Sequence, residues 1–140
     1  MNIIVCLDDK NGMMFNKRRQ SKDSILRKNI YKSLSGKSLW MNEYSYQQFE
    51  EDQYDPICVD EQFMEKAKKG EYCFVENIKI AGYKDSIEKM IVYKWNRNYP
   101  SDFKLDLSLD DGEWILESTE EFAGNSHEKI TKEEYGRHEK

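Results

Sequence analysis

The first 49 residues contain the pattern that decides the fold. Residues 1–16 read M-N-I-I-V-C-L-D-D-K-N-G-M-M-F-N, an apolar run typical of a buried central strand, followed by a turn at Asn11-Gly12. Residues 38–49 read S-L-W-M-N-E-Y-S-Y-Q-Q-F, a second strand that leads into a helix. Strands followed by helices form parallel sheets, so we expect the loops after both strands at one sheet edge, where α/β proteins bind ligands.

The segment between these two strands predicts an amphipathic helix. Asp23 or Ser24 is a suitable N-cap, and Gly36 ends the helix. The apolar positions recur every four residues, at Leu26, Ile30 and Leu34. Residues 13–22 before this helix are polar and basic, and we expect them to form a loop.

The rest of the chain alternates strands and helices first and then contains strands alone. Ser45 is expected to cap a helix that ends at Phe49, and Asp60 a helix closed by Gly70, while residues 50–52 are expected in a solvated loop. Further strands are predicted at 56–59, 72–75, 89–95, 101–107, 114–116 and 129–135. This order predicts one α/β domain over residues 1–140, with a mixed, mostly parallel sheet and an antiparallel C-terminal edge.

Composition excludes several classes of protein. The 140 residues have a net charge of −5, whereas a nucleic-acid-binding protein needs a concentrated basic surface, so we expect no nucleic-acid partner. The first strand begins near Met1 without a basic or long apolar leader, and no segment is apolar enough to span a membrane. We therefore expect a cytoplasmic protein with no membrane partner.

Cysteines and histidines give no metal or redox motif. Cys6, Cys58 and Cys73 lie in separate apolar runs without a C-x-x-C, which favours free buried thiols. No H-E-x-x-H string exists, so no metal site is predicted. For His127 we prefer packing in a hairpin over catalysis, and His138 is expected in a mobile charged end.

A cluster of polar residues lies in the loop before the first helix. Arg18 and Arg19 are able to clamp a phosphate or carboxylate, with Gln20 and Ser21 adding hydrogen bonds. The alternative is an exposed basic loop that balances an acidic surface. Tyr44 is similarly able to stack on a planar ligand or simply to pack.

Several strings together resemble dihydrofolate reductase. They are the first strand with its glycine turn, the helix that begins Asp23-Ser24-Ile25, and the segment from Ser38 to Phe49. The tail is the closest match, with W-I-L at 114–116, S-T-E-E-F at 118–122 and N-S-H at 125–127. The resemblance implies a three-layer sandwich, with helices on both faces of the sheet.

The resemblance also implies roles for two residues. Asp23 matches the family's helix acid, which hydrogen-bonds a pterin-like ring and helps to protonate it, and which can have a raised pKa in an apolar cleft. The alternative for Asp23 is a plain helix N-cap. Ser45 matches the hydroxyl position at the start of the next helix, where the family binds phosphate.

The departures from the family fall on its cofactor-binding residues. Glu76-Asn77 stands in place of a glycine pair that lets the backbone approach the cofactor pyrophosphate, and Asn42-Glu43 in place of a glycine-arginine pair. Both changes add a negative charge near the expected phosphates. We therefore expect no NADPH binding in the family's usual manner and predict no cofactor.

Two functions remain open at this point. The first is a ligand-binding or regulatory module for a small planar or phosphorylated ligand, bound between Asp23, the Arg18-Arg19 loop and Ser45. The alternative is a divergent reductase of a pterin- or flavin-like substrate, with Asp23 assisting protonation. Glu43, Glu76 and Asn77 favour the first. A homodimer is also left open.

Overall fold

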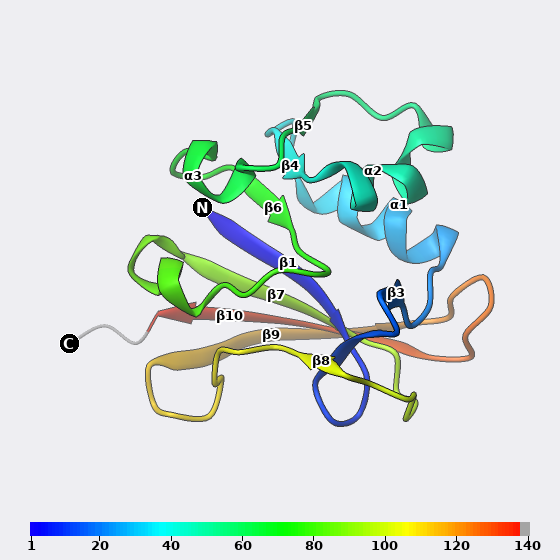
Figure 1. Ribbon diagram of the computed structural model, residues 1–140. Coiled ribbons are helices and arrows are strands. Elements are labelled where there is room, and N and C mark those ends of the chain that lie inside the picture. Colours follow the sequence, from blue (N-terminus) through cyan, green and yellow to red (C-terminus); the bar gives the residue numbers. More distant parts are fainter. Residues whose placement is uncertain (138–140) are drawn as a thin grey trace.

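A central sheet of seven strands organises the molecule. The computed structural model describes residues 1–137, so the expectation for His138 lies outside the described residues. The strands follow the order β5-β4-β6-β1-β7-β10-β9 (Figure 1). Their bounds are β1 Asn2–Leu7, β4 Leu39–Met41, β5 Ile57–Val59, β6 Tyr72–Phe74, β7 Lys89–Lys94, β9 Trp114–Phe122 and β10 Ile130–Arg137.

The sheet is mixed, as predicted. Strands β5, β4, β6, β1 and β7 pair in parallel, whereas β10 pairs antiparallel with both β7 and β9. In the central strand, Ile3, Ile4 and Val5 are at most 1% exposed, because both faces of the sheet are covered.

Helices cover both faces and complete three layers, which confirms the predicted architecture (Figure 1). One face carries α1 (Ser24–Ser33) and α2 (Glu43–Phe49), which leads into the 3₁₀ turn η1 (Glu50–Asp52). The other face carries α3 (Phe63–Lys66) and the 3₁₀ turn η2 (Ala81–Ser86). Each face therefore has its own apolar core, and the two cores are separated by the sheet.

A small second sheet replaces the loop expected at residues 13–22. Strands β2 (Gly12–Phe15) and β3 (Arg18–Arg19) form a hairpin, and β8 (Phe103–Lys104) pairs with β2. The turn is possible because Asn16 and Lys17 both adopt positive φ, as two-residue hairpin turns require. The expected strand at 101–107 is thus wrong in length and in position, since only β8 is formed and it lies outside the main sheet.

Three expectations about helices need correction. The helix expected between Asp60 and Gly70 is reduced to α3, with Gln62 at its N-cap position and Ala67 at its C-cap position. Asp23 caps α1 as predicted, but α2 is capped by Asn42, and Ser45 lies inside the helix. Asn42 and Ser45 are both good capping residues, and the strand ends at Met41, which leaves Asn42 at the first turn. The acidic run at 50–52 is exposed, as expected, but it forms η1 rather than an irregular loop, and Asp52 accepts a hydrogen bond from Arg27 of α1 at 2.6 Å.

Other local predictions are confirmed. Gly36 follows α1 with φ of +80°, and Asn11 has the positive φ expected of a turn residue. All three cysteines are free thiols, although only Cys73 is fully buried. Within residues 1–137, no helix is long and apolar enough to cross a bilayer.

Candidate functional site

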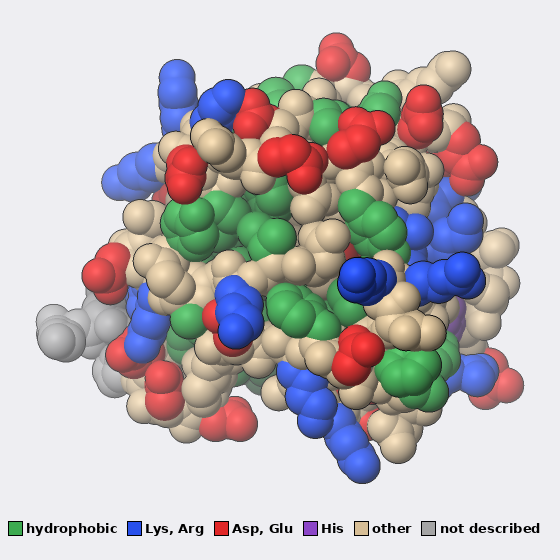
Figure 2. Space-filling model, viewed as in Figure 1, with side chains coloured by type: hydrophobic (Ala, Val, Ile, Leu, Met, Phe, Trp, Pro, Cys, Tyr) green, Lys and Arg blue, Asp and Glu red, His purple; other side chains and the backbone are tan. Residues whose placement is uncertain are grey.

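The N-terminus of α2 is occupied by the chain's own side chains. Asn42 Oδ1 accepts a hydrogen bond from the backbone N–H of Ser45 at 3.1 Å, and Glu61 Oε2 accepts one from the N–H of Glu43 at 2.9 Å. Free N–H groups at a helix start are what bind phosphate groups. Both of these N–H groups already have an oxygen partner. The side chain of Glu43 itself is exposed. Figure 2 shows many acidic side chains along the upper edge of this face.

Glu76 is a buried carboxylate two residues after β6. It accepts hydrogen bonds from Ser45 Oγ at 2.8 Å and from Gln48 Nε2 at 2.9 Å, so it joins the loop after β6 to α2. Arg19 of β3 adds two further bonds, from Nε to Oε2 at 2.9 Å and from Nη2 to Oε1 at 3.2 Å. The residue is 8% exposed. Four donors from two elements, α2 and β3, therefore fix this carboxylate, as a buried charge requires.

Arg19 and Tyr44 close the same network from the hairpin side. The backbone N–H of Arg19 donates to the Tyr44 hydroxyl at 2.8 Å, its Nη2 donates to the Tyr44 carbonyl at 3.1 Å, and its guanidinium lies 4.5 Å from the ring centre. Burial lowers the pKa of Arg19, but the hydrogen bonds and charge of Glu76 raise it more, so the guanidinium stays charged. The β2–β3 hairpin is thereby fastened to α2.

Asn42 and Asn77 bridge the remaining gap at this sheet edge. Asn42 Nδ2 donates to Asn77 Oδ1 at 2.8 Å, which links the end of β4 to the loop after β6. This amide pair lies beside the Glu76 cluster, because Asn77 is its chain neighbour. The expected phosphate-binding positions are thus connected to one another by side chains.

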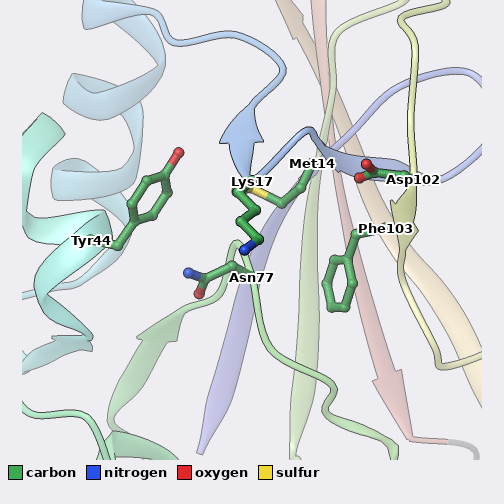
Figure 3. Close-up of a pocket in the computed structure, with 6 residues that line it drawn as sticks. All are labelled: Met14, Lys17, Tyr44, Asn77, Asp102 and Phe103. Carbon is green, nitrogen blue, oxygen red and sulfur yellow. The ribbon is translucent and has the colours of Figure 1, made fainter.

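A cavity of about 490 Å³ lies on the outer side of this network. Figure 3 shows its labelled side chains converging from the hairpin, from α2, from the loop after β6 and from β8. The lining residues are Met14, Lys17, Tyr44, Asn77, Asp102 and Phe103. The cavity combines an aromatic ring on each side with one cation, the exposed Lys17, and one carboxylate, Asp102, which accepts a hydrogen bond from the backbone N–H of Asn16 at 3.0 Å (Figure 3). Such a mixture suits a small planar ligand with an anionic group.

Asp23 lies away from this cavity and is fully engaged. Besides capping α1, its carboxylate accepts hydrogen bonds from the backbone N–H groups of Asn125 and Ser126 at 2.9 and 3.0 Å, and it lies 2.9 Å from His127 Nδ1. Burial raises the pKa of Asp23, but these bonds outweigh it and lower the pKa to about 2. The raised pKa expected for an apolar cleft is therefore wrong, because the β9–β10 hairpin supplies donors.

Arg18 and Gln20 point to a different part of the surface. Gln20 Nε2 donates to Asp8 Oδ2 at 3.1 Å and to the Pro100 carbonyl at 3.2 Å. Both residues line a second cavity of about 500 Å³, together with Phe15 and Tyr99. The structure thus divides the predicted ligand cluster between two cavities.

The predicted site residues therefore fall into groups. Arg19, Ser45 and Tyr44 meet around Glu76, with Asn42 and Asn77 beside it, whereas Asp23, Arg18, Gln20 and the side chain of Glu43 are elsewhere. Sequence reasoning missed Gln48, although its spacing of three from Ser45 places both on one helix face. It also missed Lys17, because the hairpin turn that presents this residue was not predicted.

Comparison with solved structures identifies the fold. The chain is similar to dihydrofolate reductase from Enterococcus faecalis complexed with NADP(H) and RAB-propyl, with a TM-score of 0.68 and 10% sequence identity. The match covers 99% of this chain and 96% of the other. No protein-family model and no curated protein sequence matches. The chain thus has a dihydrofolate-reductase-like fold, and at this identity the likeness shows the fold alone.

Proposed function

We propose that this protein is a small-ligand-binding module built on a dihydrofolate-reductase-like fold, and that it does not hold NADPH in that family's manner. The observation that carries the proposal is Glu76, a buried carboxylate with four donors of its own. The fold's relatives need a glycine pair there, so that backbone approaches a pyrophosphate.

The residues at this edge do not fit a dinucleotide. Glu76 adds a side chain and a charge, and Arg19, the cation nearest to it, is already paired. The carboxylate of Glu61 takes an N–H at the start of α2, and the Asn42–Asn77 bond spans the neighbouring strands' ends. A pyrophosphate would have to displace these bonds and approach several carboxylates, each at a cost of about 1 kcal/mol or more.

The cavity beside Tyr44 is the ligand site that we propose. Tyr44 and Phe103 offer aromatic faces, Met14 an adaptable apolar surface, and Lys17 one positive charge. Lys17 has no ion-pair partner among residues 1–137, so its charge is available to a ligand. The ligand class is therefore planar and anionic, which includes the phosphorylated ligands expected from the sequence.

The reductase alternative receives less support. A pterin-protonating acid needs a carboxyl that faces its substrate, but the oxygens of Asp23 already accept backbone and histidine hydrogen bonds. With its pKa lowered to about 2, Asp23 holds no proton near neutral pH. The geometry thus favours a role for Asp23 in holding the start of α1 over a role as a proton donor.

A thermal-shift screen of pterins, flavins and nucleotides, followed by calorimetry, tests the proposal. We expect at least one planar anionic compound to raise the melting temperature. Lys17→Ala should weaken its binding about tenfold, the effect of one charge-assisted contact of about 1.4 kcal/mol. Lys79→Ala, an exposed lysine outside the cavity lining, is the matched control. Failure of all compounds, or equal effects of the two substitutions, would contradict the assignment.

A further inference from the structure

Three side chains line up at the N-terminus of α1, where Asp23 caps the helix. Ser21 Oγ lies 2.9 Å from His127 Nε2, and His127 Nδ1 lies 2.9 Å from Asp23 Oδ2. Ser21 follows β3, Asp23 caps α1, and His127 follows the β9–β10 turn. We propose that Ser21, His127 and Asp23 form a nucleophilic serine site that cleaves small anionic esters. This site is separate from the cavity beside Tyr44.

The hydrogen bonds define the direction of proton transfer. Because Asp23 is ionised, it accepts a hydrogen bond from His127 Nδ1–H, which leaves a lone pair on Nε2. The donors near Nε2 are the hydroxyls of Ser21, at 2.9 Å, and Tyr99, at 3.3 Å. Nε2 is thereby placed to take the Ser21 proton, as a general base does in serine hydrolases.

Packing holds the imidazole in this orientation. Its ring stacks on Trp95, with 4.5 Å between ring centres and 28° between planes. The side chains of Asp23 and His127 are 0% and 4% exposed, whereas Ser21 is half-buried. Gly124 permits this close packing, since a Cβ there would lie 2.5 Å from Asp23 Oδ2. The nucleophile is partly exposed and its positioning residue, Asp23, is buried, as the chemistry requires.

A cavity of about 500 Å³ suggests the substrate class; no triad residue lines it, but it is lined by Gln20, the chain neighbour of Ser21, and by Tyr99. Tyr99 lines it and reaches His127 Nε2. Arg18 also lines it and is exposed, and its guanidinium has no ion-pair or hydrogen-bond partner among residues 1–137, so it suits a substrate carboxylate. Gln20 Oε1 is buried with no hydrogen-bond partner in the described part of the chain. A carboxylate-bearing ester small enough for this cavity fits these groups.

The reaction follows from these positions. Ser21 Oγ attacks the ester carbonyl carbon and its proton passes to His127 Nε2. The carbon–oxygen bond to the alcohol breaks, and the alcohol leaves with that proton. Water then attacks the acyl-serine, gives a proton to His127, and releases the acid, while the proton returns to Ser21 Oγ. The sum is ester plus water giving acid plus alcohol.

Labelling with a fluorophosphonate probe tests the site on the whole chain. The serine oxygen forms a bond to phosphorus, fluoride leaves, and His127 takes the proton. We expect one adduct per chain, with peptide mapping locating it on Ser21. No adduct, or an adduct on another residue, would overturn the proposal.

Variants of Ser21 and His127 test the role of each residue separately. Ser21→Ala should abolish labelling, and His127→Gln should slow it about 100-fold, the usual contribution of a general base. Ser24→Ala, three residues away and outside the triad, is the matched control and should label like the wild type. Circular dichroism and melting curves establish that each variant folds. If a folded His127→Gln labels at the wild-type rate, the histidine is not the base and the proposal fails. If His127→Gln does not fold, the location of the adduct in the wild-type chain decides.

Discussion

The molecule contains two buried carboxylates, Glu76 and Asp23, and they are stabilised in different ways. Glu76 depends on a cation and two neutral side chains brought from β3 and α2. Asp23 depends on backbone N–H groups of α1 and of the β9–β10 hairpin, with His127 added. The resemblance led us to expect ligand contacts at both positions, but in this structure both side chains make hydrogen bonds within the protein instead. Glu76 joins the sheet to α2, and Asp23 joins α1 to the C-terminal hairpin.

The largest effect is expected at Glu76. Glu76→Ala leaves Arg19 partly buried without its partner, and we expect a loss of about 3 kcal/mol in the free energy of unfolding, measured by urea denaturation. Glu43→Ala removes an exposed acid of the same region and should cost less than about 1 kcal/mol. Equal and small losses of unfolding free energy in both variants would mean that the Glu76 network stabilises the fold no more than the exposed Glu43 does.

The second expected effect concerns Asp23 and pH. Its pKa is lowered to about 2 in the folded chain, below the usual value near 3.9 of an unfolded chain. Its stabilisation is therefore complete above about pH 4 and is lost as the pH falls from about 4 to 2, by about 2 kcal/mol. Urea unfolding at several pH values measures this loss.

Two variants separate Asp23 from the other carboxylates. Asp23→Asn should be less stable at pH 6 and should lose less stability between pH 4 and 2 than the wild type. Asp9→Asn, at an exposed position, should keep the wild-type pH dependence. If Asp23→Asn keeps the wild-type dependence of unfolding free energy on pH, Asp23 is not the carboxylate whose protonation destabilises the fold.

The smallest expected effect comes from Gly124. A Cβ at Gly124 would lie 2.5 Å from Asp23 Oδ2 and 2.7 Å from Ile130 Cδ1, so Gly124→Ala should lower stability by about 1–2 kcal/mol through overpacking. Gly82→Ala meets no atom within 4 Å and serves as control. A melting temperature of Gly124→Ala equal to that of the control would show that the hairpin adjusts easily around Asp23.

Local patterns predicted the sheet and α1 well. Uninterrupted apolar runs such as Ile3–Leu7 are long enough to indicate strands, and the spacing of Leu26, Ile30 and Leu34 defines a helix face. The β2–β3 hairpin was not predicted, because the Asn16-Lys17 turn lacks the glycine that usually marks positive φ.

The site was harder to predict, because its contacts join distant positions. The expectation that Glu76 stands in a ligand-binding position came from the resemblance, but its pairing with Arg19 spans 57 residues, and no local pattern connects them. Asp23 and His127 lie 104 residues apart. A carboxylate's environment decides whether its pKa rises or falls, and for Asp23 that environment is supplied by a hairpin at the far end of the chain.

Titration of the purified chain with NADPH by calorimetry tests whether Glu76 and its partners exclude the cofactor. We expect no binding tighter than about 1 mM, because these side chains occupy the position that a pyrophosphate needs. The double variant Glu76→Gly with Asn77→Gly removes the carboxylate and frees Arg19, so it should bind NADPH more tightly than the wild type. Micromolar binding by the unaltered chain would contradict the account.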